Sequence, residues 1–142
     1  MTASCDPRGL LAGVHPDLAR VISTAELLPQ PFIVIQGLRT EDSEAEACKS
    51  GNSQTMHSRH LAEADGLARA VDLCAVTDGA LDWAEGCEAE VFGQIAAQIK
   101  AAAQLRGVPL QWGGDPVGAW EPGVPSNFRD WGHFQLPWLQ YP

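Results

Sequence analysis

The chain contains 142 residues, and we expect a single domain spanning residues 1–142. Hydrophobic residues make up 45% and charged residues 19%, a composition that can bury a core and is not typical of a disordered chain. With 9 basic and 18 acidic residues the formal net charge is −9, which argues against binding to nucleic acid or to an anionic membrane surface.

The N-terminal segment predicts little regular structure. We expect residues 1–12 to form a loose arm ahead of the first helix. They lack a basic region followed by a long apolar stretch, so we expect no signal peptide. No apolar run in the chain approaches the roughly 18–20 residues of a membrane span.

Two helices and one strand are predicted in the first third of the chain. Apolar residues at helical spacing predict a helix over residues 16–28, which the prolines that follow would end. Residues 32–35 are a short, β-branched apolar run and predict a buried strand. Residues 40–49 begin with a threonine and then carry acidic residues, which predicts a second helix.

The remainder of the chain alternates strands and one long helix. Strands are predicted over residues 70–76, over 108–112 and within 128–136, and a helix over 87–106. The long Gly- and Pro-rich segment 113–127 is expected to be a functional loop. Because most connections are too short for parallel crossovers, the order favours an α+β fold with helices packed on a small, largely antiparallel sheet.

Three residues far apart in the sequence form a candidate metal site. Asp72 stands in the apolar strand over residues 70–76, where a carboxylate is costly unless it is paired or bound to a metal. His60 closes a polar segment, and His133 lies in the last predicted strand. Two imidazoles and a carboxylate are a common ligand set for catalytic zinc, with water in the fourth position. In the alternative interpretation, the histidines are ordinary surface or core residues and Asp72 caps a turn or pairs with an arginine.

Asp130 is the candidate general base, three residues before His133. Zinc lowers the pKa of a bound water toward about 7, and a second carboxylate then accepts the proton. Positions i and i+3 of a straight strand face opposite sides, so Gly132 is expected to supply a turn or bulge. A solvated loop acid is the alternative interpretation of Asp130.

Several ordered segments together resemble the phage-type L-alanyl-D-glutamate peptidases, which are zinc endolysins related to the VanY-like D-Ala-D-Ala carboxypeptidases. The segments are GVHPDL at 13–18, GLRT at 37–40, GNSQTMHSRH at 51–60, AVDL at 70–73, WGGD at 112–115 and DWGHFQL at 130–136. The similarity covers about residues 13–137. It implies the α+β fold of the hedgehog and D-Ala-D-Ala-peptidase type, in agreement with the predicted elements.

The resemblance implies that His60, Asp72 and His133 hold Zn²⁺. The spacing from His to Asp in the family is seven positions, whereas twelve separate His60 from Asp72, so we expect an insertion of five residues within 62–66. Asp65 is the rival ligand because it lies closer to His60. Asp72 is preferred because the AVDL segment matches the family.

The resemblance also implies four residues that act beside the metal. Asp130 would be the general base. Arg39 would steady the scissile carbonyl or its oxyanion, a role suited to a fixed cationic fork. Gln54 and Ser58 match polar positions near the site and would orient ligands or substrate.

The resemblance thus implies a single-domain zinc metallopeptidase, an endolysin that cuts the L-Ala–D-Glu bond of the peptidoglycan stem peptide. One alternative is a D,D- or L,D-carboxypeptidase that trims the stem peptide, and another is a non-catalytic, zinc-stabilised binding domain. We expect a monomer that binds the stem peptide and that binds neither nucleic acid nor a membrane. Without a signal peptide, it is expected to stay in the host cytoplasm until it is released to the cell wall.

Overall fold

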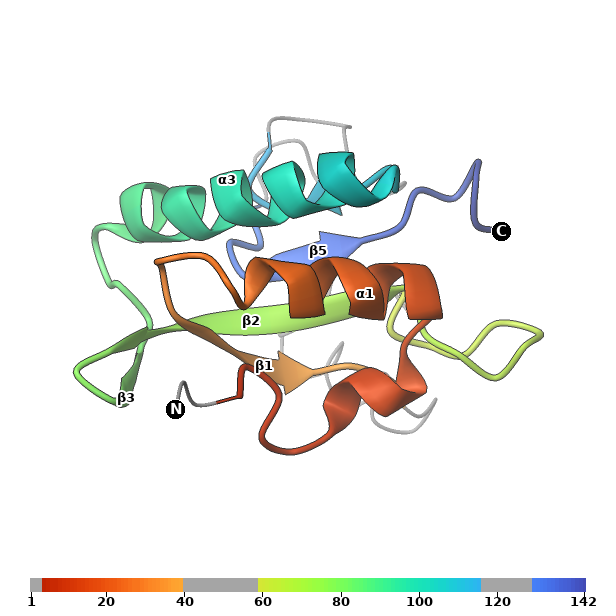
Figure 1. The fold of residues 1–142 in the computed structure, drawn as a ribbon, viewed down its shortest axis with the longest axis horizontal. Helices are drawn as coiled ribbons and strands as arrows, with labels where there is room; N and C mark the ends of the chain where they lie inside the picture. The colour runs from red at the N-terminus through yellow and green to blue at the C-terminus, as the bar shows by residue number, and fades with distance from the viewer. Residues whose placement is uncertain (1–3, 40–58, 116–128) are drawn as a thin grey trace.

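The computed structural model describes residues 4–39, 59–115 and 129–142 (Figure 1). The elements in chain order are η1 (Leu10–Gly13), α1 (Pro16–Ala25), β1 (Phe32–Gln36), β2 (Ala70–Thr77), β3 (Ala80–Asp82), α3 (Glu88–Arg106), β4 (Gln111–Trp112) and β5 (His133–Gln135). In the described ranges, no helix combines the length and apolar character that crossing a bilayer requires. The predicted helix over 40–49 and most of the predicted loop over 113–127 lie outside these ranges.

The strands form one antiparallel sheet with β2 at its centre. The strand order is β1-β2-β5-β4, and β3 pairs with β2 beyond the end of β5. Strand β3 was not predicted; Asp78 and Gly79 form a turn, and the chain folds back on β2 after it. The α+β fold with a small antiparallel sheet is confirmed by the structure.

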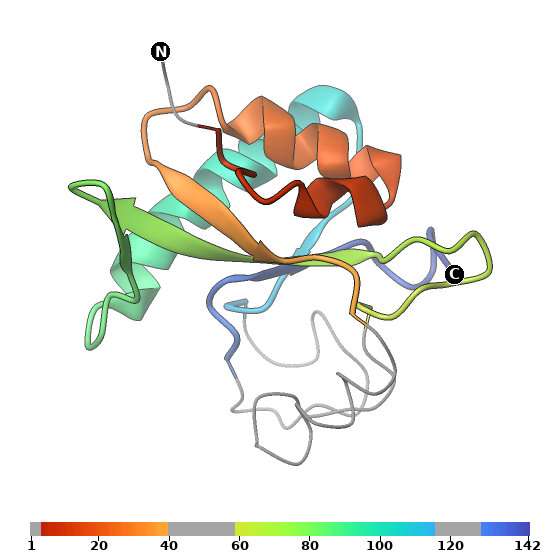
Figure 2. The same cartoon turned by 90° about the horizontal axis from the view of Figure 1, so that it is seen from below.

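Helices α1 and α3 cover one face of this sheet (Figure 2). The buried residues of α1 recur at helical spacing and include Leu18 and Ile22. In β2, Val71 and Leu73 belong to the same hydrophobic core, and so does Phe134 of β5. Because side chains alternate between the faces of a strand, the residues between these core positions face away from the helices.

The ends of the helices follow from their local sequence. His15 caps α1, since its Nδ1 accepts a hydrogen bond from the Asp17 N–H at 3.1 Å. Helix α1 ends at Ala25, three residues earlier than predicted. After Glu26, the N–H groups of Leu27 and Leu28 bond to carbonyls three residues back, which tightens the chain before the prolines. Helix α3 spans nearly the predicted residues and ends at Gly107, whose φ of 69° is left-handed.

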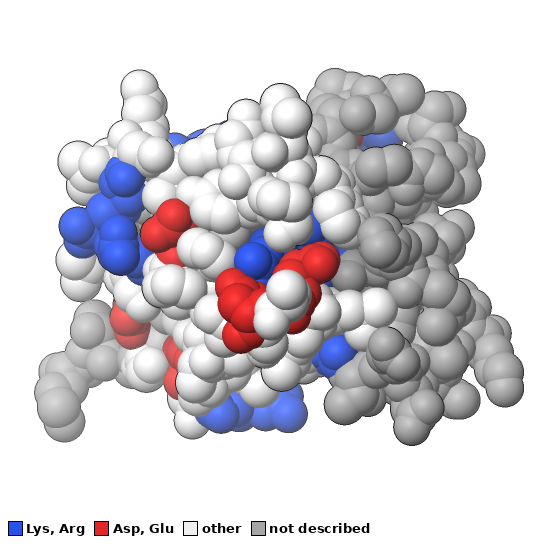
Figure 3. All heavy atoms as spheres, turned by 90° about the vertical axis from the view of Figure 1, so that its right-hand side faces the viewer, with Lys and Arg blue, Asp and Glu red and all other residues white. Residues whose placement is uncertain are grey.

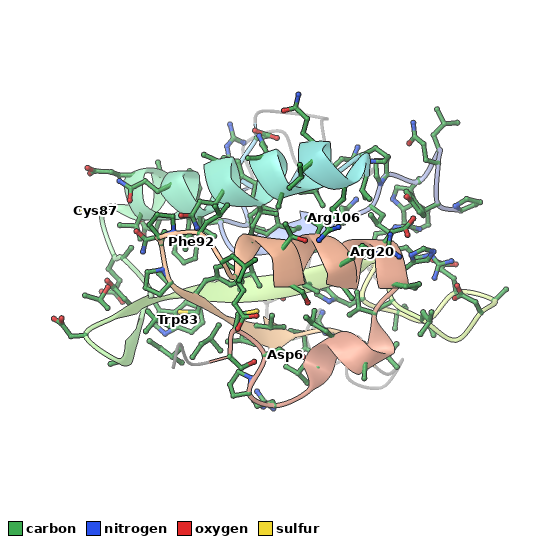
Figure 4. The ribbon with its side chains drawn as sticks, in the orientation of Figure 1. Asp6, Arg20, Trp83, Cys87, Phe92 and Arg106 are labelled. Atoms are coloured by element: carbon green, nitrogen blue, oxygen red, sulfur yellow. The ribbon has the colours of Figure 1, made fainter. Side chains whose placement is uncertain are left out.

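The expectation of a loose arm over residues 1–12 is wrong from residue 4 onward. Cys5 is 5% exposed and packs in the core, and its carbonyl accepts a hydrogen bond from the Val34 N–H at 2.7 Å. Asp6, labelled in Figure 4, accepts the N–H groups of Leu10 and Leu11 at the start of η1. The edge strand β1 has N–H groups that need acceptors, and this segment supplies one.

Candidate metal centre

The face of the sheet opposite the helices carries polar side chains, which come from alternating positions of β2 and β5. Asp72 lies between the core residues Val71 and Leu73 of β2. It stands directly opposite His133 in the β2–β5 pairing. Gln135 follows His133 on the same face of β5, because positions i and i+2 share a face. The alternation that buries the core therefore also gathers these polar groups.

His60 reaches the same face from the segment that follows the undescribed residues. The Arg39 N–H donates to the His60 carbonyl at 2.8 Å, which ties this segment to the chain after β1. The His60 side chain is 3% exposed, and its Nδ1 lies 2.8 Å from the carbonyl oxygen of Gly37. Because a carbonyl only accepts hydrogen bonds, Nδ1 carries the proton. The other ring nitrogen, Nε2, lies 3.2 Å from Asp72 Oδ1.

His133 is oriented by contacts on both ring nitrogens. Its Nδ1 lies 3.1 Å from Asp72 Oδ1, and its Nε2 lies 2.7 Å from Gln135 Oε1. Gln135 in turn donates from its Nε2 to Gln111 Oε1 at 3.1 Å. This chain of amides turns the Gln135 oxygen toward the ring, so the Nε2 of His133 is the donor. The ring therefore presents Nδ1 to Asp72, as a metal ligand with an outer hydrogen bond does.

The three side chains could hold a metal ion together. Ligand atoms of His60, Asp72 and His133 all lie within 4.8 Å of one another. Zinc bonds of about 2.0–2.1 Å in a tetrahedron place neighbouring ligand atoms roughly 3.3 Å apart. The separations of 3.1 and 3.2 Å between Asp72 Oδ1 and the two ring nitrogens match this spacing. A His₂Asp set leaves one tetrahedral position for water or substrate.

The charges in this group are strongly coupled. Burial alone would raise the pKa of Asp72, but the two histidines outweigh it and hold the pKa of that carboxyl well below its usual range. Burial would likewise lower the pKa of His133, yet the hydrogen bond to Asp72 and the charges of Asp130 and Asp72 raise it to about 9. A cation that replaces the His133 proton would meet the same negative field.

Asp130 lies at the mouth of the site, before β5 begins. Its Oδ2 is 4.0 Å from His133 Nδ1. A turn joins the two residues, since the His133 N–H donates to the Asp130 carbonyl at 3.1 Å. An added Cβ on Gly132 would lie 2.2 Å from the carbonyl oxygen of Leu73, so the turn needs glycine where it crosses β2. The predicted turn at Gly132 is confirmed.

The environment of Asp130 favours its neutral form more than water does. Burial, with the Asp72 charge second, raises the pKa of Asp130 to about 6. A carboxyl with a pKa this close to neutrality both accepts and returns a proton readily near pH 7. This property distinguishes it from Asp72, which the histidines keep ionised.

Arg39 also points into the site. One of its terminal nitrogens is 3.7 Å from Asp72 Oδ2, and the side chain is 12% exposed. The backbone of Arg39 is held by a parallel bridge to Leu61. Its guanidinium is therefore a fixed positive charge beside Asp72, the carboxylate of the candidate metal centre.

The rival ligand Asp65 is not part of this group. The loop of residues 61–68 projects from the side of the fold in Figure 1, and Asp65 pairs there with Arg69 at 2.7 Å. The Arg69 hydrogen bond and the Leu67 N–H lower the pKa of Asp65 to about 2. Figure 3 shows this side of the molecule, with acidic and basic side chains in contact at its centre.

Two sets of residues remain. Some were expected at the site but lie outside the described ranges, and others lie at the site but were not predicted. Gln54 and Ser58 lie outside the described residues. Gln135 and Gln111 were not predicted to belong to the site. Placing Gln135 required only the two-residue period of the strand that carries His133, but Gln111 joins through the β4–β5 register, which no local pattern indicates.

Comparisons with known proteins point to one family of peptidases. The sequence model of the phage L-alanyl-D-glutamate peptidase family matches residues 3–136. The chain is 28% identical over 132 residues to an L-alanyl-D-glutamate peptidase of Escherichia phage T5, which covers 89% of this chain and 90% of that protein. It is also similar to the crystal structure of the Serratia marcescens L-Ala D-Glu endopeptidase ChiX. That match has a TM-score of 0.74 and 36% sequence identity, and it covers 94% of this chain and 88% of the other.

Proposed function

This chain belongs to the phage L-alanyl-D-glutamate peptidase family, and from that premise we propose that it is a zinc-dependent endolysin. Its reaction is hydrolysis of the L-Ala–D-Glu bond in the peptidoglycan stem peptide. The observation that carries the proposal is the buried group of His60, Asp72 and His133 with Asp130 beside it. Such a group supports hydrolysis, since a purely structural metal site needs no general base.

The three residues of the buried group would hold the metal through His60 Nε2, an Asp72 carboxylate oxygen and His133 Nδ1. A zinc ion bound there would supply an acidified water and a polarised scissile carbonyl. Gln135 and the Gly37 carbonyl keep the two imidazoles in orientation by holding their other nitrogens.

Asp130 would move the proton. Its carboxylate accepts a proton from the attacking water and returns it to the amine that leaves as the C–N bond breaks. L-Ala then ends in a carboxylate, and D-Glu acquires a new amino terminus. The pKa of about 6 leaves Asp130 largely ionised at neutral pH, yet basic enough to take the proton.

Arg39 would hold the scissile carbonyl oxygen while negative charge develops on it. Its guanidinium is largely buried, and it is placed 3.7 Å from the Asp72 carboxylate, at the edge of the metal group. A fixed donor there costs no reorganisation during the reaction. Gln54 and Ser58 remain candidates for orienting substrate, on the family resemblance alone. We also propose that the protein acts as a monomer, after its release to the cell wall.

Product analysis tests this function against the carboxypeptidase alternative. Purified peptidoglycan is incubated with the protein, and the fragments are identified by mass spectrometry. We expect new D-Glu amino termini and no free D-Ala, whereas release of D-Ala would establish the carboxypeptidase. Elemental analysis should find about one zinc ion per chain. Chelator treatment should abolish cleavage, and added zinc should restore it; cleavage unaffected by chelation would reject the metal mechanism.

A further inference from the structure

A cavity of about 290 Å³ opens beside the metal centre, and Asp72 and Asp130 both line it. It extends from these carboxylates toward the start of α3, where Trp83 and Phe92 line it. Figure 4 labels these two residues, which lie at the same end of the molecule as Cys87. The cavity is therefore continuous with the reaction centre and holds more than the reacting bond.

The topology of the sheet explains why the cavity exists. Strands β3 and β5 pair with the same edge of β2, because β1 occupies the other edge. Strand β5 pairs with Ala70 to Asp72 of β2, and the pairing of β3 with β2 begins only at Ala75. Between them, no strand among the described residues completes the edge, and one contact there is the Leu73 N–H donating to the Gly132 carbonyl at 2.8 Å. The opening lies in this interval.

Away from Asp72 and Asp130, the lining combines apolar walls with two further, opposite charges. Phe92 is 3% exposed and Trp131 is partly buried, while Trp83 is 53% exposed. Glu88 and Arg129 supply the charges. Within residues 4–39, 59–115 and 129–142, no hydrogen bond or ion pair engages the Glu88 carboxylate. A partly buried carboxylate on an apolar wall suits a cationic ligand group.

We propose that this cavity is the subsite for the residue that follows D-Glu in the stem peptide, with Glu88 recognising the ammonium at the end of its side chain. The inference rests on the proposed function. The L-Ala side of the scissile bond leads to the uncharged lactyl group of the glycan. The D-Glu side carries a free α-carboxylate and then a diamino acid. The charges of Glu88 and Arg129 thus have counterparts on the D-Glu side only.

The size and the walls of the cavity agree with this occupant. Pockets for drug-sized ligands start near 300 Å³, so about 290 Å³ suits one or two amino-acid residues rather than a disaccharide with its peptide. The methylene chain of a diamino acid would lie along Phe92 and Trp83. Arg129 would face the α-carboxylate of D-Glu, nearer to Asp130.

Two synthetic substrates that differ in a single amino group test the subsite. They are N-acetyl-L-Ala-γ-D-Glu-L-Lys and the same peptide with norleucine in place of lysine. For the zinc-loaded wild-type protein we expect kcat/KM to be about tenfold higher for the lysine peptide, the scale of a hydrogen bond to a partly exposed charge. Glu88→Gln should remove this preference by lowering kcat/KM for the lysine peptide to about the value for the norleucine peptide.

Glu90→Gln is the matched control. Glu90 is an exposed acid of the same first helical turn but does not line the cavity, so this variant should keep the tenfold preference. Trp83→Ala should raise KM for both peptides and leave their ratio intact. Equal kcat/KM for the two peptides in the wild type, or an equal loss of preference in both glutamine variants, overturns the subsite. Failure of the wild type to cleave either peptide while it also leaves peptidoglycan intact overturns the proposed function itself.

Discussion

The two faces of strand β2 are built from adjacent residues and have different roles. Leu73 and Val71 are buried in the hydrophobic core under the helices. Asp72, between them, points to the opposite face and meets both histidines. One face stabilises the fold through apolar burial, and the other holds charges whose placement depends on that fold. Substitutions at neighbouring positions should therefore separate stability from chemistry.

The largest expected effect is on the polar face. Asp72→Asn removes the carboxylate that both imidazoles share, so zinc affinity should fall by several orders of magnitude and peptide hydrolysis should become undetectable. Titration of the metal-free protein with zinc, followed by calorimetry, measures the affinity, and circular dichroism confirms that the variant is folded. Zinc binding as tight as in the wild type would remove Asp72 from the ligand set.

Asp130→Asn should separate catalysis from metal binding on that face. The amide cannot accept the water proton, so kcat should fall about 10²–10⁴-fold, while zinc stays bound because Asp130 is not one of the three ligands. In the wild type, kcat/KM should fall as the pH is lowered through about 6, since protonation of Asp130 then removes the base. A bound cation lowers the pKa of Asp130 and so moves this fall in kcat/KM to lower pH. Unchanged turnover in the variant would show that another group moves the proton.

Leu73→Ala should have the opposite pattern. The side chain is 1% exposed in the core, and its truncation leaves a cavity that should cost about 2–5 kcal/mol of unfolding free energy. Denaturant titration measures this loss. The folded fraction should bind zinc with wild-type affinity, because the ligand atoms lie on the other face. A parallel loss of zinc affinity in Leu73→Ala and Asp72→Asn would mean that the two faces are not separable.

The smallest effect is expected at Gln135, whose side-chain amide contacts His133. Gln135→Leu removes the acceptor for His133 Nε2, and zinc affinity should fall about 10–100-fold. Gln135→Glu keeps an acceptor and should restore the affinity, as competition with a chelating dye would show. Gln98 bonds to Gln30 away from the metal centre, so Gln98→Leu is the control and should leave the affinity unchanged. Equal affinities for the two Gln135 variants would contradict an orienting role.

The sequence predicted those features that depend on local patterns. Apolar spacing located α1, β1, β2 and α3 to within a few residues, because each element must bury one face or stripe. The N-terminal arm was mispredicted because its order comes from the edge of β1, which is remote in sequence. A carboxylate in an apolar strand marked Asp72 as a residue that needs partners, and that local anomaly was visible without a structure.

The chain alone therefore determined which residue types are present for the proposed metal site of this peptidase: two histidines and two carboxylates in segments of family-like order. Only the tertiary structure decided that Asp72 rather than Asp65 meets the histidines, and that Gln135 and Gln111 stand behind one of them. It also opened the cavity between β3 and β5. The physical reason is strand register: pairing across 61 residues sets Asp72 opposite His133, and a shift of β5 by one residue would turn His133 into the core.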